Sequence, residues 1–150
     1  MALNIVLVAP EIPNNTGNIG RLCLGTNSEL HLVKPLGFEI NDSRLKRAGL
    51  DYWQHVKVNY YESWEAFLTI HSKKEMAFFS SHGQKSFWDI SFTKDMFLVF
   101  GKESTGLPEE ITTENKERLY QIPLYSPHIR GLNLANAVGI TLYEGLRQLS

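Results

Sequence analysis

The chain alternates short apolar runs of strand length with segments in which apolar residues recur at helical spacing. The apolar runs, each of which predicts a strand, cover residues 3–8, 30–33, 56–60, 76–80, 96–100 and 119–122. The segments that predict helices cover residues 18–26, 41–48, 62–71 and about 133–149. Strands that alternate with helices favour an α/β fold, with a largely parallel sheet flanked by helices.

The length and composition fit a single domain that spans residues 1–150. Of the 150 residues, 43% are hydrophobic and 21% are charged, so the chain can bury an ordinary core. The sequence contains no internal repeat, no low-complexity stretch and no linker.

Cysteine usage and the absence of targeting signals predict a cytoplasmic protein with no membrane partner. The single cysteine, Cys23, excludes an internal disulfide and suits a reducing compartment. No apolar run approaches the roughly 20 residues of a membrane span. No basic segment precedes the first strand, as it would in a signal peptide.

Basic residues gather in one segment of a slightly acidic chain. The formal net charge is −1, which argues against broad, charge-driven binding to nucleic acid. Residues 41–60 contain four basic and two acidic residues, so this segment carries +2 and the remainder −3. Charge alone favours a solvated helix face, and RNA contact is the alternative. The side chains that would make this contact are Arg44, Lys46 and Arg47. Tyr52 and Trp53 in the same segment are more often core residues than platforms for bases.

Three polar loops follow predicted strands, at residues 80–83, 101–108 and 123–132. In open parallel sheets, ligands bind beyond the carboxyl ends of the strands. Glycines there allow the backbone to approach a ligand closely, and free backbone amides and carbonyls can read an adenine edge. Ordinary turns explain any one of these loops, but they explain all three together less well.

Several common chemistries lack their sequence signatures. The run Gly101-Lys102-Glu103-Ser104-Thr105 is no Walker A motif, because the required earlier glycine is replaced by Met96. No G-x-G-x-x-G turn and no G-x-S-x-G elbow is present. The five histidines show no metal-ligand spacing, so we expect no metal.

Three motifs resemble those of the SPOUT class of RNA methyltransferases. They are PEIPNNTGNIGRLC (residues 10–23), FGKESTGLP (100–108) and IPLYSPHIRGLNLANAVGITLYE (122–144). The segment KPLGFEINDSRLKRAGLDYW (34–53) narrows the likeness to the minimal subfamily that methylates the wobble ribose of tRNA. The resemblance implies a deep C-terminal trefoil knot and 2′-O-methylation of cytidine or modified uridine at position 34. Ribose methylation of ribosomal RNA and a non-catalytic RNA-binding knot protein are the alternatives.

The same resemblance implies a cofactor and two partners. The cofactor is S-adenosylmethionine, which leaves as S-adenosylhomocysteine and would be held mainly by backbone groups in the knotted slot. The positions that match are Phe79, Ser80, Gly101, Ile122, Gly131 and Leu132. Relatives often carry serine where this chain has Gly131, so a side-chain hydroxyl is missing there. The partners are a second copy of the chain, in a homodimer, and the anticodon stem–loop of tRNA.

The catalytic group of such enzymes maps onto Arg21. Because the pKa of arginine stays above about 12, a role in stabilising the developing alkoxide is preferable to that of a general base. Asn15 and Asn133 would orient Arg21 or cap helices. Glu103 would bind substrate or fix the loop of the second motif. Arg130 would contact phosphate or lie solvated in its loop.

Overall fold

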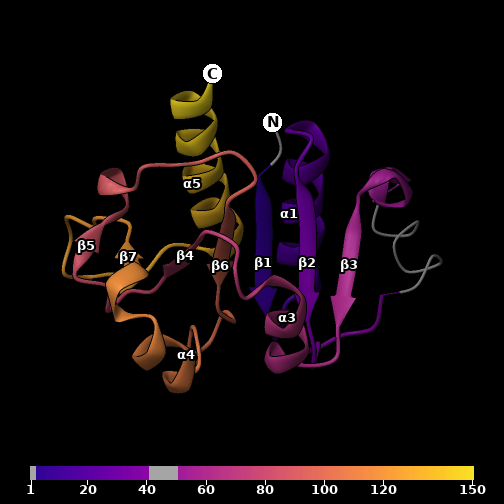
Figure 1. The fold of residues 1–150 in the computed structure, drawn as a ribbon, viewed down its shortest axis with the longest axis horizontal. Coiled ribbons are helices and arrows are strands. Elements are labelled where there is room, and N and C mark those ends of the chain that lie inside the picture. The colour runs from indigo at the N-terminus through magenta and orange to yellow at the C-terminus, as the bar shows by residue number, and fades with distance from the viewer. Residues whose placement is uncertain (1–2, 41–50) are drawn as a thin grey trace.

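The fold is built on a parallel sheet whose strand order is β3-β2-β1-β6-β4-β7-β5 (Figure 1). The computed structural model describes residues 3–40 and 51–150. Within them the seven strands are β1 (Asn4–Val8), β2 (Glu29–Val33), β3 (Val58–Tyr61), β4 (Met76–Phe79), β5 (Lys85–Ser86), β6 (Phe97–Phe100) and β7 (Leu119–Gln121). Every neighbouring pair is parallel, which confirms the α/β fold with a parallel sheet flanked by helices.

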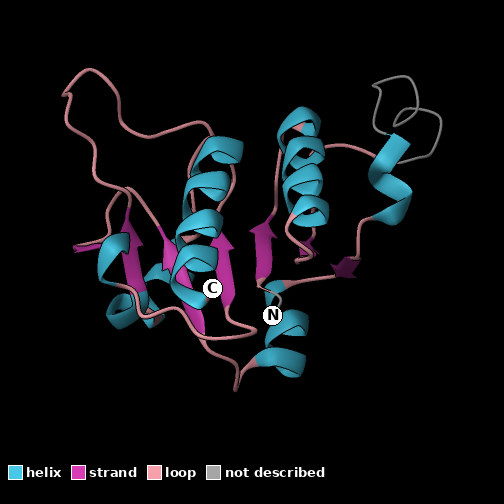
Figure 2. Cartoon of the chain, turned by 90° about the horizontal axis from the view of Figure 1, so that it is seen from above, coloured by secondary structure: helices cyan, strands magenta, loops and turns pink. Residues whose placement is uncertain are grey.

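Helices cover both faces of this sheet. The longer ones in the described residues are α1 (Pro13–Gly25), α3 (Trp64–His71), α4 (Glu109–Glu114) and α5 (Leu134–Leu149). The 3-10 helices are η1 (Asp51–His55), η2 (Phe87–Asp89) and η3 (Lys116–Arg118). Figure 2 shows α1 and α5 side by side on one face of the sheet and α3 on the other.

Each face of the sheet has its own hydrophobic core, and β1 contributes to both. Ile5 and Leu7 join the cluster beneath α1 and α5, whereas Val6 and Val8 join the cluster with Phe67 of α3. All five residues of β1 are buried. Strands covered on both faces carry continuous apolar runs rather than alternating ones, and such runs made the strands visible in the sequence.

Most element boundaries differ from the sequence prediction by one or two residues, and those of α1 and β3 have local reasons. Helix α1 begins at Pro13 rather than at residue 18, because proline is well suited to the first helical turn and the apolar periodicity starts only later. Strand β3 spans Val58–Tyr61 instead of residues 56–60, since η1 extends to His55. Strand β5 and helix α4 were not predicted. The predicted helix at residues 41–48 lies outside the described residues.

Helix α5 confirms the predicted C-terminal helix. Its N-cap is Asn133, whose side-chain oxygen accepts a 3.2 Å hydrogen bond from the backbone amide of Asn136. Among the described residues, no helix is both long and apolar enough to span a membrane. The threading of the C-terminal segment into a knot stays a prediction.

Candidate active site

The three polar loops leave the sheet at one edge. Strand β4 lies between β6 and β7, with Phe79 paired to Phe100 on one side and to Tyr120 on the other. Ser80 and Gly101 are therefore the first residues beyond the sheet on adjacent strands. The amide of Ser80 donates a 2.9 Å hydrogen bond to the carbonyl of Tyr120. The carboxyl ends of three adjacent strands thus bring together loops that are distant in the sequence.

Gly101 allows the loop after β6 to fold back on itself. A Cβ atom there would lie 2.0 Å from the carbonyl carbon of Gly106 and 2.1 Å from the amide nitrogen of Leu107. The turn is closed by a 2.9 Å hydrogen bond from the amide of Gly106 to the carbonyl of Lys102. Gly106 has a φ of 74°, which favours glycine. Neighbouring backbone therefore accounts for the glycine at position 101.

The carboxylate of Glu103 ties this loop to the start of α1. It accepts hydrogen bonds from the backbone amides of Glu11 (2.8 Å) and Ile12 (3.0 Å). It also accepts one from the side-chain amide of Asn15, at 3.1 Å. Ile12, the N-cap residue of α1, has no side chain that could cap the helix. Glu103 supplies acceptors that this helix end otherwise lacks, and its negative charge suits a helix N-terminus.

A return contact strengthens the same junction. One carboxylate oxygen of Glu11 accepts a 2.9 Å hydrogen bond from the backbone amide of Ser104. Hydrogen bonding from Ser104 holds the pKa of Glu11 below its ordinary value. The loop after β6 and the segment before α1 are therefore linked in both directions.

Asn15 extends the network to the start of α5. Its side-chain oxygen accepts a 3.1 Å hydrogen bond from the side-chain amide of Asn133, the cap of α5. Three of the four predicted catalytic residues, Asn15, Glu103 and Asn133, therefore form one chain of hydrogen bonds. In the described part of the protein neither asparagine bonds to Arg21, and the side chain of Asn133 caps α5.

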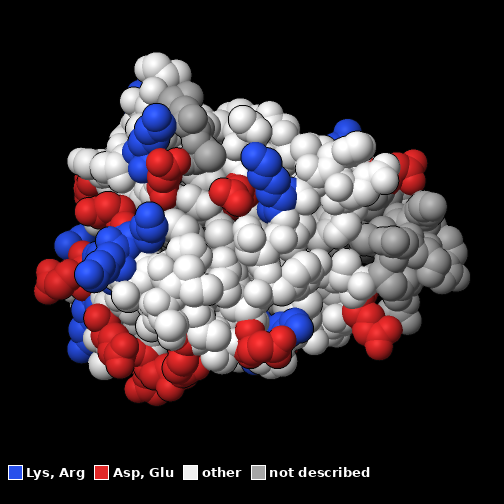
Figure 3. All heavy atoms as spheres, turned by 45° about the vertical axis from the view of Figure 1, so that its right-hand side comes forward, with Lys and Arg blue, Asp and Glu red and all other residues white. Residues whose placement is uncertain are grey.

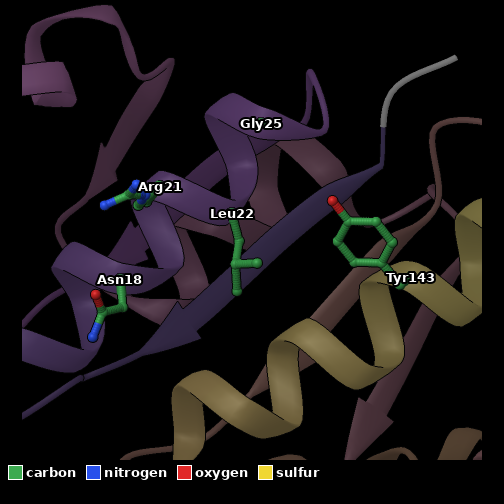
Figure 4. Close-up of a pocket in the computed structure, with 5 residues that line it drawn as sticks. All are labelled: Asn18, Arg21, Leu22, Gly25 and Tyr143. Carbon is green, nitrogen blue, oxygen red and sulfur yellow. The ribbon is translucent and has the colours of Figure 1, made fainter.

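Arg21 lies apart from that network, on an exposed face of α1. Its guanidinium carbon is 5.6 Å from the ring centroid of Tyr52. It also borders an open hollow of about 420 Å³ between α1 and α5. The residues that line this hollow are Asn18, Arg21, Leu22, Gly25 and Tyr143. Figure 4 shows Leu22 of α1 and Tyr143 of α5 pointing into the space between the two helices.

Sequence reasoning did not single out Asn18, Gly25 or Tyr143. A signal was present, because Asn18, Leu22 and Gly25 recur at helical spacing on one face of α1. Cys23 of the same helix is fully buried, and burial raises the pKa of its thiol to about 12. Such a thiol is inert, which agrees with its assignment to a helix core.

The remaining predicted residues have different positions. Arg130 and Leu132 are exposed between β7 and α5, and Ile122 is half-buried. Gly131 is exposed, and a Cβ there would meet no atom within 4 Å. The predicted RNA-binding residues Arg44, Lys46 and Arg47 lie outside the described residues.

Charge on the described surface is mixed. Figure 3 shows one face on which Lys and Arg lie among Asp and Glu around a largely uncharged centre. Among residues 3–40 and 51–150, no three His, Cys, Asp or Glu side chains come together as possible metal ligands.

Comparison with known proteins assigns the fold to a family. The model of the SpoU rRNA Methylase family matches residues 2–143. The chain belongs to the SpoU rRNA methylase family. Membership confirms the resemblance that the three sequence motifs carried. The same motifs contain Arg21, Glu103 and Asn133.

Individual members of the family are similar to this chain in both sequence and structure over nearly its whole length. A tRNA (cytidine(34)-2′-O)-methyltransferase of Methylovorus glucosotrophus is 44% identical over 146 residues, which cover 97% of this chain and 94% of that protein. A solved structure, described as giving insights into the 2-OH methylation of C/U34 on tRNA, superposes with a TM-score of 0.91 at 43% identity. That match covers 99% of this chain and 96% of the other.

A more distant member was solved with its cofactor. The SpoU methyltransferase AviRb of Streptomyces viridochromogenes, in complex with AdoMet, superposes with a TM-score of 0.78 at 25% identity. The match covers 99% of this chain and 58% of that chain.

Proposed function

We propose that this SpoU family member transfers the methyl group of S-adenosylmethionine to the ribose 2′-hydroxyl of nucleotide 34 in tRNA. The observation that carries the proposal is the 44% identity, over 97% of the chain, to a methyltransferase of that name. The structure described for C/U34 methylation supports it, since it matches from end to end. Because both matches are nearly complete on both sides, no large segment of those proteins lacks a counterpart here.

The edge formed by β4, β6 and β7 suits an adenosyl group. Adenine needs polar groups at its edge and apolar contacts on its faces. Ser80, Gly101 and Ile122 directly follow β4, β6 and β7, so their backbone groups lie at this edge. Leu132 supplies an exposed apolar side chain, and Phe79 borders the edge from within the core. We assign cofactor binding to these residues together with Gly131.

Arg21 is the residue that we assign to the chemical step. When bound, S-adenosylmethionine supplies an electrophilic methyl group on a sulfonium centre. The ribose hydroxyl loses its proton, to water or to an RNA phosphate, as its oxygen forms the bond to the methyl carbon and displaces S-adenosylhomocysteine. A fixed cation beside the oxygen stabilises the negative charge that the departing proton leaves behind. Arg21 does this as a permanent cation rather than as a base, because the guanidinium group of arginine stays charged in proteins. The network of Glu103, Asn15 and Asn133 keeps α1, which carries Arg21, in place.

The basic residues Arg44, Lys46, Arg47 and Arg130 are our candidates for binding the anticodon stem–loop. The rest of the chain is slightly acidic, so attraction to phosphate must be local. Replacement of Arg44 and Arg47 by alanine should weaken tRNA binding and flatten its salt dependence, because fewer counterions are released. Equal slopes for wild type and variant across a salt series would exclude this segment from RNA binding.

A homodimer through α1 and α5 is the assembly that we infer. These helices lie side by side and expose apolar side chains, with Leu24 38%, Ile140 42% and Tyr143 56% exposed. Such a surface favours association with a second copy. A dimer would present two sets of basic residues to one tRNA. A monomeric mass at micromolar concentration would contradict this assembly.

The proposed activity is tested with RNA from a strain that lacks the gene. Total tRNA and ribosomal RNA from that strain are incubated separately with the protein and methyl-labelled S-adenosylmethionine. We expect label in tRNA, on the ribose of nucleotide 34. Label in ribosomal RNA would favour the other ribose-methylating function. Cofactor binding without transfer to either RNA would contradict both. A tRNA substrate would also imply a cytoplasmic enzyme.

A further inference from the structure

Arg21 lies against a tyrosine to which the sequence motifs give no role. The guanidinium carbon of Arg21 is 5.6 Å from the centroid of the Tyr52 ring. At this separation the negative face of the ring attracts a cation. Arg21 is exposed on α1, and Tyr52 is half-buried in η1. The candidate catalytic cation therefore has an aromatic surface as its neighbour.

The Tyr52 ring is itself fixed on α1. Its hydroxyl donates a 3.1 Å hydrogen bond to the carbonyl of Gly17, which lies one helical turn before Arg21. The next residue, Trp53, is 9% exposed and packs on Gly20, where an added Cβ would lie 2.5 Å from the Trp53 ring. These two contacts hold η1 against α1, so the ring beside Arg21 cannot move independently of the helix.

The hydroxyl of Tyr52 stays protonated at neutral pH and can therefore keep its bond to Gly17. Burial raises the pKa of Tyr52, and the positive charge of Arg21 acts in the opposite direction. Burial has the larger effect, so the pKa remains above its ordinary value.

We propose that Tyr52 is a positioning residue, whose ring face orients the Arg21 guanidinium toward the reacting ribose. A long, exposed arginine samples many rotamers, and only some of them place its charge beside the nucleophile. An aromatic face reduces that freedom and leaves the positive charge in place. A carboxylate partner would also restrict the side chain, but it would neutralise the charge. The inference rests on the proposed function, because only methyl transfer gives Arg21 a reacting group.

A double-mutant cycle between Tyr52→Leu and Arg21→Ala tests this role. Single-turnover methyl transfer to tRNA is measured with saturating cofactor. Tyr52→Leu should lower the rate about tenfold in the wild-type background and leave it unchanged in the Arg21→Ala background. Tyr52→Phe, which keeps the ring, should stay within about threefold of wild type. Equal losses in both backgrounds would overturn the proposal, since they would show that Tyr52 does not act through Arg21.

Controls separate orientation from folding. Trp88→Leu removes a 57% exposed aromatic side chain from η2 and should keep the wild-type rate. Tyr52→Leu should keep the wild-type cofactor affinity and a cooperative thermal transition. If Tyr52→Leu does not fold, Tyr52→Met, whose unbranched side chain adapts to irregular gaps, replaces it in the cycle. Failure of the wild-type protein to methylate any tRNA would contradict the proposed function itself. Equal losses from Tyr52→Leu in both backgrounds would contradict only the role of Tyr52, so the two failures are distinguishable.

Discussion

The side-chain amide of Asn15 donates a 3.1 Å hydrogen bond to the carboxylate of Glu103, across a sequence separation of 88 residues. The same carboxylate accepts hydrogen bonds from the backbone amides of Glu11 and Ile12. Two sequence motifs therefore meet at the N-terminus of α1, which Glu103 caps, and a third motif joins them through Asn133. This junction fixes the start of the helix that carries Arg21 to the loop that leaves β6.

Replacement of Glu103 by glutamine should destabilise the junction. Glutamine has one oxygen acceptor, and its amide group would face a backbone N–H that also needs an acceptor. We expect a loss of about 1–3 kcal/mol in the free energy of unfolding, measured by urea denaturation. Glu75→Gln is the matched control, because Glu75 is exposed and its side chain makes no hydrogen bond in the described residues. Equal stability of both variants would show that Glu103 is not a structural acceptor.

Replacement by alanine should be costly at one of the two glycines assigned to cofactor binding and nearly neutral at the other. At position 101 the new Cβ would overlap the backbone of Gly106 and Leu107, so the loop after β6 must move. We expect Gly101→Ala to lose about 1–3 kcal/mol of stability and at least about tenfold in cofactor affinity. Gly131→Ala meets no neighbouring atom and should stay within about 0.5 kcal/mol of wild type. Calorimetry with S-adenosylmethionine and urea unfolding measure both. Wild-type affinity in Gly101→Ala would remove this loop from the cofactor site.

A buried histidine predicts loss of stability in mild acid. His31 is 3% exposed, and its ring nitrogens lie 2.8 Å from the hydroxyl of Tyr61 and 2.9 Å from the side-chain oxygen of Asn4. Burial, assisted by the charge of His71, lowers the pKa of His31 to about 4. The unfolded chain therefore binds a proton at higher pH than the folded chain does. Stability is fully present above the ordinary histidine pKa and falls as the pH drops toward 4.

The size of this effect follows from the same pKa difference. Between pH 7 and pH 5 we expect His31 to contribute a loss of about 2 kcal/mol in the free energy of unfolding. Urea denaturation at both pH values measures it. His31→Gln should be less stable at pH 7 but should lose about 2 kcal/mol less than wild type over this interval. The same pH dependence in both proteins would mean that His31 is not the titrating group.

Removal of the Arg21 side chain should slow the chemical step without weakening cofactor binding. Arg21→Ala is expected to lower kcat by about a hundredfold or more, because a transition-state electrostatic partner is lost. Cofactor affinity should be nearly unchanged. Arg21→Lys should rescue poorly, since an ammonium group lacks the planar fork of the guanidinium. Steady-state kinetics with tRNA measure these changes. Wild-type turnover in Arg21→Ala would exclude it from the mechanism.

Local pattern was sufficient to predict most of the fold. The strands at residues 4–8 and 97–100 are buried on both faces, so their apolar runs are continuous. Helix α5 carries an apolar stripe and a capping residue, both visible in the sequence. Strand β5 has only Lys85 and Ser86, and it exists because it pairs with β7. A two-residue polar strand leaves no local pattern.

The sequence predicted which residues belong to the candidate site better than it predicted how those residues contact one another. Motif resemblance selected Arg21, Asn15, Glu103 and Asn133, and three of them prove to be joined by hydrogen bonds. The separation of Arg21 from that network was missed, because the predicted helix began at residue 18 and left Asn15 outside it. The contact of Arg21 with Tyr52 depends on how η1 packs on Gly17 and Gly20. Such tertiary contacts have no counterpart in helical spacing.

The identity of the methyl acceptor is the central claim, and a single-atom change in the RNA tests it most directly. Full-length tRNA is prepared with a 2′-deoxy nucleotide at position 34, and control tRNAs carry the same change at either neighbouring nucleotide. Each is incubated with the protein and labelled S-adenosylmethionine. We predict that the change at position 34 abolishes transfer and that the controls accept label as unmodified tRNA does. Undiminished transfer to the tRNA that lacks the hydroxyl at position 34 would contradict the proposed function.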